Sequence, residues 1–350
     1  MKIPTASGLE GVVAAQTALS HVDGEKGELI IAGARLEAFA GRLSFEEACG
    51  RLWKEPKVDL GDARFWAATL LPTLGGALER PDGMDALRAS IAQLPAGCDA
   101  TKVTAAMGVF GAAWARLKAG LQPVAPDPRL SHAADIARMV IGETPAPALV
   151  KALETYLVAV TDHGMNASTF TARVIASTDS DLVSAVTGAL GALKGPLHGG
   201  APGPVLDMLD AVGTPQHATA WLEAELTAGR RIMGMGHRIY RVRDPRAAVL
   251  EAAVERLEKT GVTSRRLALA RAVEQAATQV LAKRYPDRGL KANVEFYTAV
   301  LLDTVGMPRG LFSPLFAMGR VAGWCAHFAE QKATGRLIRP ASEYVGPMPE

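Results

Sequence analysis

The segment Lys194-Gly195-Pro196-Leu197-His198-Gly199-Gly200 places a histidine inside a glycine-rich turn, and Met233-Gly234-Met235-Gly236-His237-Arg238 does the same thirty-nine residues later. Glycine is poor helix material, costing about 1 kcal/mol per site against alanine. Its repeated use around an imidazole indicates close approach of the backbone to a ligand. Histidine is also the side chain best suited to proton transfer near neutrality, so both histidines are candidate catalytic residues.

The rest of the composition indicates a mostly helical globular protein. The chain has 350 residues, of which 49% are hydrophobic, 21% are charged and only 5% are aromatic. That length exceeds the usual size of a single core, so we expect roughly two packed units.

The charge pattern argues against nucleic acid as a partner. The 38 basic residues are nearly balanced by 36 acidic ones, and the sequence has no block of like charge. The three cysteines form no CxxC pair and indicate a reducing compartment. The N-terminus lacks a signal-peptide core, and the longest uncharged apolar run, 182–193, is too short to span a bilayer. We therefore expect a cytoplasmic protein without a membrane segment.

Turn signals near the N-terminus predict a short hairpin. Asp23-Gly24 and Gly27 lie between Val12-Val13 and the apolar run at 29–31. From Ser44 to about Leu193, apolar residues recur at helical spacing, which predicts a series of helices.

Glycines at 195–203 interrupt this pattern and mark a domain boundary. Asp244-Pro245 then has the form of a helix start, with Gly261 beyond the end. A further helix is expected from a Ser264 cap to about Arg284.

Several more residues could complete a site around the two histidines. His163 follows Asp162, Glu295 follows Asn293-Val294, and three arginines stand out. These arginines are Arg246 at a helix start, Arg320 in an apolar segment and Arg339 near the C-terminus.

Each residue also has a structural interpretation. His163 could be a hydrogen-bonded core histidine, and Glu295 could simply favour a helix N-terminus. Arg320 needs an anionic partner or an escape to solvent, and Glu330 or another buried carboxylate could be that partner.

Two other kinds of site fit less well. The histidines show neither HxxxH nor HExxH spacing, so no metal is expected. Gly234-Met235-Gly236 lacks the third glycine of a dinucleotide-binding loop, because position 239 is isoleucine. A carboxylate, two histidines and several arginines instead suit carbon–carbon bond formation through an enol. The carboxylate removes a carbon-bound proton, a neutral histidine stabilises the oxyanion, and arginines hold a polycarboxylate.

These motifs resemble those of the citrate synthase family. The turns around His198 and His237 resemble its two active-site segments, and the likeness runs from Gly8 through 166–170 to Arg339-Pro340 and Tyr344. The resemblance implies an all-α, two-domain homodimer with a short N-terminal hairpin. It implies a large domain formed by 1–199 and 309–350 and a small domain formed by 200–308.

The resemblance also implies a role for each candidate residue. His198 would bind the thioester carbonyl of acetyl-CoA, His237 would polarise and protonate the carbonyl of oxaloacetate, and Glu295 would be the base. His163, Arg246 and Arg320 would bind oxaloacetate, with Arg339 arriving from the partner subunit. The expected coenzyme A contacts are Arg241 and the backbone of Ile232, Met233, Gly234, Met235 and Gly236. No metal or redox cofactor is implied.

One position departs from the family's usual pattern. The base is commonly aspartate in Asn-Val-Asp, whereas this chain has Glu295 after Asn293-Val294. The extra methylene displaces the carboxylate by about 1.5 Å unless the surroundings adjust, and this matters for proton transfer. Citrate synthesis is the first expectation. The alternatives are 2-methylcitrate synthesis from propionyl-CoA and a catalytically weak protein that binds dicarboxylates or acyl-CoA.

Overall fold

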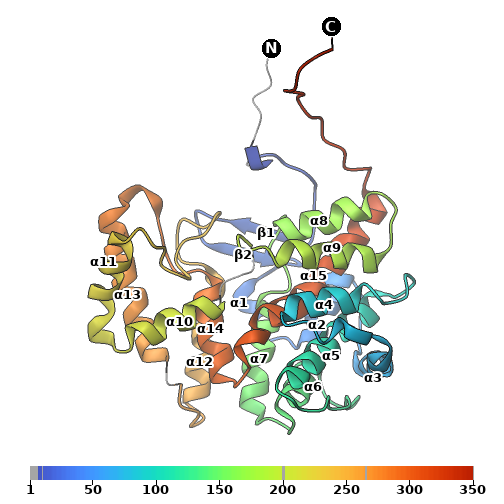
Figure 1. Cartoon of the computed structure of the whole chain (residues 1–350), viewed down its shortest axis with the longest axis horizontal. Helices are drawn as coiled ribbons and strands as arrows, with labels where there is room; N and C mark the ends of the chain where they lie inside the picture. The colour runs from blue at the N-terminus through green and yellow to red at the C-terminus, as the bar shows by residue number, and fades with distance from the viewer. Residues whose placement is uncertain (1–6, 10, 199–201, 265, 350) are drawn as a thin grey trace.

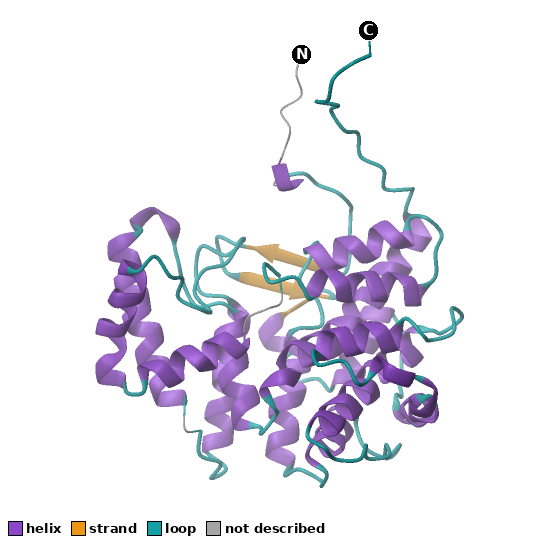
Figure 2. Cartoon of the chain, in the orientation of Figure 1, coloured by secondary structure: helices purple, strands orange, loops and turns teal. Residues whose placement is uncertain are grey.

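The computed structural model describes residues 7–9, 11–198, 202–264 and 266–349. Helices dominate it, and Figure 2 shows a single small patch of strand among them. The predicted all-α class is therefore confirmed. The end of the first glycine motif, 199–201, and with it the expected boundary at 199/200, lies outside the described residues.

Helices follow one another from residue 36 to residue 193, as the apolar spacing predicts. Their bounds are α1 Leu36–Phe39, α2 Phe45–Trp53, α3 Gly61–Thr69, α4 Gly83–Ile91, α5 Ala100–Lys118, α6 His132–Ile141, α7 Pro147–Ala159, α8 Ala167–Ala176 and α9 Leu182–Leu193. Short polar side chains fix most of the starts by accepting a hydrogen bond from a backbone N–H of the first turn. These caps are Ser44, Asp82, Asp99, Ser131, Asn166 and Asp181.

The later helices are α10 Pro202–Val212, α11 Ala218–Thr227, α12 Pro245–Glu258, α13 Leu267–Arg284, α14 Val294–Thr304 and α15 Phe312–Thr334. The start of α12 is confirmed, with Asp244 as the cap and Pro245 in the first turn. The predicted start of α13, with Ser264 as its cap, is wrong by a few residues. The hydroxyl of Ser264 accepts the Leu267 N–H at 3.2 Å but also bonds to Thr304 Oγ1 at 3.0 Å, and regular helix begins only at Leu267.

The predicted hairpin is present, but its first strand was misplaced. Strand β1 (Ser20–Asp23) pairs antiparallel with β2 (Glu28–Ile31), and a two-residue strand β3 (Ala34–Arg35) extends the sheet. Val12-Val13 lies outside the sheet and is exposed. The turn at 24–27 packs on the loop after His237, where a Cβ on Gly24 would lie 2.4 Å from the Ile239 carbonyl oxygen. This contact explains why glycine stands there.

Helix α15 forms the centre of the larger group of helices and packs on α2, α5, α7, α8 and α9 (Figure 1). Helices α10 to α14 lie together on the other side of the view, where α12 packs on α14 and also on α7. None of the helices in the described part of the chain is long and apolar enough to cross a membrane. Although its surroundings are apolar, α15 buries Arg320 and His327. Arg320 is one of the candidate site residues, and His327 contacts Asp162, which precedes the candidate His163.

Candidate active site

His198 lies in the turn after α9 and is held by the first turn of α8. The backbone N–H of Ser168 donates to its Nε2 at 3.3 Å, and the Ser168 hydroxyl lies 2.9 Å from the same atom. Because a backbone N–H can only donate, Nε2 is an acceptor and the neutral ring carries its proton on Nδ1. Burial, reinforced by Arg320, lowers the pKa of His198 to about 4. His198 is therefore a neutral hydrogen-bond donor at pH 7.

His237 is held the opposite way round. The backbone N–H groups of Ile239 and Tyr240 donate to its Nδ1 at 3.0 and 3.2 Å, so the neutral ring carries its proton on Nε2. Burial and the positive charge of Arg246 lower the pKa of His237 to about 4. His198 and His237 thus offer two neutral N–H donors, from Nδ1 in the first and from Nε2 in the second.

His163 joins this pair, as predicted. It is buried, its ring meets that of His237 edge-on with centroids 5.4 Å apart, and its Nε2 lies 3.1 Å from the Tyr240 hydroxyl. Burial and Arg246 hold the pKa of His163 well below its usual range. His163 is thus a buried, hydrogen-bonded histidine that also lies beside His237.

Arg246 is buried in the first turn of α12, where its guanidinium forms a two-pronged contact with the cap of its own helix. Its Nε and Nη2 lie 3.0 and 2.7 Å from the two carboxylate oxygens of Asp244. Asp244 also accepts the Val294 N–H at 3.2 Å, so the same carboxylate ties α12 to α14. The ion pair stabilises a positive charge that a helix N-terminus would otherwise repel.

Arg320 is 1% exposed and its positive charge is only partly compensated. Nε donates to the Val160 carbonyl at 2.6 Å and the guanidinium lies over Phe316, but Nη2 is buried without a partner among the described residues. Glu330, the partner considered from sequence, instead contacts Arg173 at 2.6 Å. Burial and the nearby Arg246 lower the pKa of Arg320 to about 10. Such a guanidinium is suited to bind an anion.

Glu295 lies in the first turn of α14, capped by Asn293. Asn293 also joins this turn to the His237 loop, since its N–H donates to the Gly234 carbonyl and its amide to the Gly236 carbonyl, both at 2.9 Å. Burial raises the pKa of Glu295 to about 7, although Arg246 opposes the shift. Near neutrality this carboxyl group can therefore take up and release a proton.

The candidate coenzyme A segment runs beside Glu295. Met235 forms an antiparallel bridge with Ala292, and a Cβ on Gly234 would lie 2.9 Å from the Phe296 ring. Gly234 and Gly236 both have positive φ, a conformation that favours glycine. Ile232 is buried, and Arg241 is exposed while its backbone N–H donates to Gly24 at 3.0 Å.

The family model described as the citrate synthase C-terminal domain matches residues 8–341. The chain is also 36% identical to a citrate synthase of Haloferax volcanii, over 97% of this chain and 95% of that protein. This chain belongs to the citrate synthase family.

Two further relatives match this chain over different shares of their length. A 2-methylcitrate synthase of Mycobacterium tuberculosis is 36% identical over 97% of this chain and 90% of its own length. A further relative from that organism is 51% identical over 205 residues, and this chain spans about half of that protein, 54% of its length.

Two solved structures have the same fold. A Pyrobaculum aerophilum citrate synthase has a TM-score of 0.88 at 32% identity, covering 100% of this chain and 95% of that one. The ternary complex of carboxymethyl coenzyme A and oxaloacetate with the Thermoplasma acidophilum enzyme has a TM-score of 0.88 at 27% identity, covering 99% and 97%.

Two residues of α15 that hold parts of the candidate site in place were not predicted from the sequence. Trp324 donates from Nε1 to the Ser168 hydroxyl at 3.2 Å, and His327 contacts Asp162 at 3.2 Å. Both follow Arg320 at helical spacing, four and seven residues later, so one buried face of α15 holds three parts of the site. That spacing of polar groups within an apolar helix was the available signal.

Arg339 is the one candidate that this chain does not bring to the others. It lies exposed in the extended segment after α15, which leaves the body of the molecule in Figure 1. Arg339 therefore stands apart from the candidate site within this chain. Among the described residues, no cluster of three or more His, Cys, Asp or Glu side chains could hold a metal ion.

Proposed function

We propose that this protein condenses oxaloacetate with acetyl-CoA and releases citrate and coenzyme A. The observation that carries the proposal is that Glu295, His198 and His237 all lie within reach of the buried Arg246, whose charge acts on the pKa of each of them. Membership of the citrate synthase family supports it, as does the Thermoplasma complex with oxaloacetate and a coenzyme A analogue.

In the first step, ionised Glu295 removes a proton from the methyl group of acetyl-CoA. The Nδ1–H of His198 donates to the thioester oxygen as negative charge develops there. A neutral imidazole can perform this task. In triosephosphate isomerase, too, a glutamate is the base and a neutral histidine, not an imidazolium, polarises the carbonyl.

In the second step, the enol carbon attacks the carbonyl carbon of oxaloacetate. The carbonyl oxygen takes the Nε2 proton of His237 and becomes the hydroxyl of citryl-CoA, and the proton that Glu295 removed from acetyl-CoA is relayed within the site to restore neutral His237 and ionised Glu295. Water then cleaves the thioester, giving the carboxylate of citrate and free coenzyme A thiol. None of these steps requires a metal or redox group.

The remaining candidates bind the substrates. His163, Arg246 and Arg320 would hold oxaloacetate, with the unpartnered Nη2 of Arg320 donating to a carboxylate. Arg241 and the 232–236 backbone would border coenzyme A. We retain the division into a large domain, 1–199 and 309–350, and a small domain, 200–308, which would close over both substrates.

The test is release of coenzyme A thiol, followed with a thiol-reactive chromophore, on mixing the protein with oxaloacetate and either acetyl-CoA or propionyl-CoA. We expect oxaloacetate-dependent release with a higher kcat/KM for acetyl-CoA. A preference for propionyl-CoA would instead support 2-methylcitrate synthesis. The chain is 36% identical both to the Haloferax citrate synthase and to the Mycobacterium 2-methylcitrate synthase, so sequence identity does not favour either activity. One methylene in an apolar pocket discriminates by about 1–3 kcal/mol, so we expect turnover with both thioesters and compare them at matched concentrations. No release with either would leave only a binding role.

We also propose a homodimer in which Arg339 enters the site of the partner subunit. Mixing inactive Arg339→Ala chains with inactive His237→Ala chains should then restore activity. In the mixed dimers, one of the two sites has both intact residues, so random exchange gives about a quarter of wild-type activity. If Arg339 served its own chain, every mixed site would carry one defect and no activity would return.

A further inference from the structure

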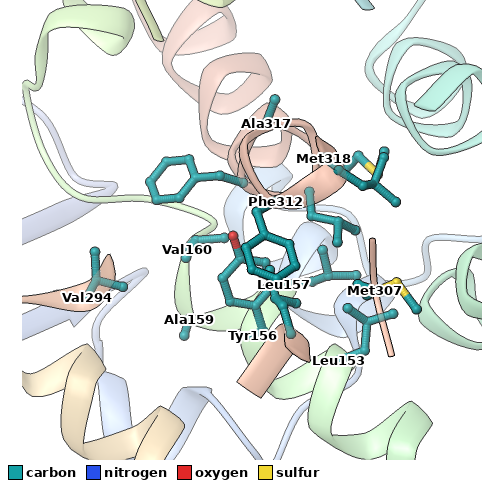
Figure 3. Close-up of a cluster of buried hydrophobic side chains, with 14 of the residues drawn as sticks. Leu153, Tyr156, Leu157, Ala159, Val160, Val294, Met307, Phe312, Ala317 and Met318 are labelled. Atoms are coloured by element: carbon teal, nitrogen blue, oxygen red, sulfur yellow. The ribbon is translucent and has the colours of Figure 1, made fainter. Parts of the chain in front are cut away.

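Tyr156 on α7 has a buried hydroxyl that the site described above leaves unused. The residue is 0% exposed, and Figure 3 shows its ring among Leu153, Leu157 and Phe312. Within the described part of the chain, its hydroxyl has no hydrogen-bond partner. Removing a hydroxyl from water without a new partner is unfavourable, and phenylalanine would fill the same space without that cost. A tyrosine at this position therefore suggests a partner that arrives from outside the chain.

The charged groups of the site are near enough to act on this hydroxyl. Burial has the largest effect on the pKa of Tyr156, and among the charged groups Arg320 acts most strongly, followed by Glu295 and Arg246. Arg320 is held at this end of α7, because its Nε donates to the carbonyl of Val160, one turn after Tyr156. In Figure 3 the tyrosine oxygen lies on the side of the cluster labelled Val160. Two buried polar groups without partners, the Tyr156 hydroxyl and Arg320 Nη2, thus belong to one region.

The chemistry of these two groups selects the ligand. The guanidinium can only donate hydrogen bonds, and burial raises the pKa of Tyr156 above its ordinary value, so the hydroxyl keeps its proton. Two donors and one positive charge suit a carboxylate. Glu295 could accept from Tyr156, but no hydrogen bond joins them and its electrostatic effect on the hydroxyl is smaller than that of Arg320.

We propose that Tyr156, together with Arg320, binds a carboxylate of the keto-acid substrate. The inference rests on the proposed function and adds a substrate-binding residue to it. A carboxylate of the substrate would supply the hydrogen bond that the Tyr156 hydroxyl does not find among the described residues.

The variant Tyr156→Phe tests this, because it removes the hydroxyl and keeps the packed ring. Binding of oxaloacetate to the full-length protein, measured by calorimetry, should weaken about tenfold to a hundredfold, as expected for a hydrogen bond to a charged group. The KM for acetyl-CoA should stay within about twofold. The Tm of the ligand-free variant should be equal to or above that of the wild type.

Ser90→Ala is the matched control. Ser90 is also fully buried, and its hydroxyl has no hydrogen-bond partner among the residues that the structure describes, but it lies on α4, which packs on α5 and α9. This variant should leave oxaloacetate binding unchanged.

Wild-type affinity in Tyr156→Phe would overturn the inference while leaving the proposed function intact. An altered pH dependence of kcat with unchanged affinity would also overturn it, because the hydroxyl would then serve Glu295. If the wild-type protein itself fails to bind oxaloacetate, the proposed function fails first.

Discussion

Glu295→Gln should lower kcat for citrate formation by about 10²- to 10⁴-fold, the usual contribution of a general base. Glutamine keeps the shape of the side chain but cannot take the methyl proton of acetyl-CoA. Oxaloacetate should still bind, since its contacts are expected from His163, Arg246 and Arg320. Steady-state rates together with exchange of the acetyl protons into deuterated water measure the loss directly.

The pH dependence gives this prediction a second readout. Glu295 must be ionised to act as a base and burial raises its pKa to about 7, so kcat should rise with pH and level off above about 7. His198 and His237, with pKa values of about 4, stay neutral across this range. Glu295→Asp is the control that keeps a base. Unchanged turnover in Glu295→Gln would remove Glu295 from this role.

The stability of the folded protein should change with pH in the opposite direction to kcat. The carboxyl of an unfolded chain ionises near 4.5, but in the folded protein it ionises near 7. Between these values the folded state holds the extra proton, so its stability falls as pH rises. Glu295→Gln removes this penalty and should add about 1–3 kcal/mol at pH 8 but little at pH 5. Thermal unfolding at the two pH values distinguishes this gain from a general effect of the substitution.

Local sequence was enough to locate most helix starts and the candidate histidines. Asp244-Pro245 predicts the start of α12 because a capping carboxylate and a proline favour that geometry whatever surrounds them. The glycines before His237 similarly mark a turn with positive φ. These features depend on a few neighbouring residues, so they can be read from the sequence without knowledge of the fold.

Features that depend on distant contacts could not be predicted. Strand β1 begins at Ser20 and not near Val12, because the turn it leads into packs on Ile239 and Val242, more than two hundred residues later. Glu330 contacts Arg173 on α8 and not Arg320 on its own helix. The support of His198 by Ser168 and Trp324 likewise joins three segments that are far apart in sequence.

Arg320→Met should weaken oxaloacetate binding by about a hundredfold or more without unfolding the protein. Methionine fills much of the same apolar space, and among the described residues Arg320 forms no ion pair that the change would break. Its side chain contacts the Val160 carbonyl and the Phe316 ring. The pKa of Arg320, lowered to about 10 by burial and by Arg246, indicates that its surroundings destabilise its charge. Stability should therefore change by only about 1 kcal/mol. Calorimetry with oxaloacetate and thermal unfolding measure the two effects separately.

Arg246→Met is the informative comparison, because both arginines are buried and both are expected to bind the same ligand. Arg246 neutralises Asp244, whose carboxylate is fully buried and also accepts the Val294 N–H. Its loss leaves that carboxylate without a counter-charge and should cost about 3–5 kcal/mol of stability in addition to the loss of binding. The two variants should thus share a binding defect and differ in Tm. Equal destabilisation by both would mean that Arg320 is a structural cation, and the anion site would then have to be built without it.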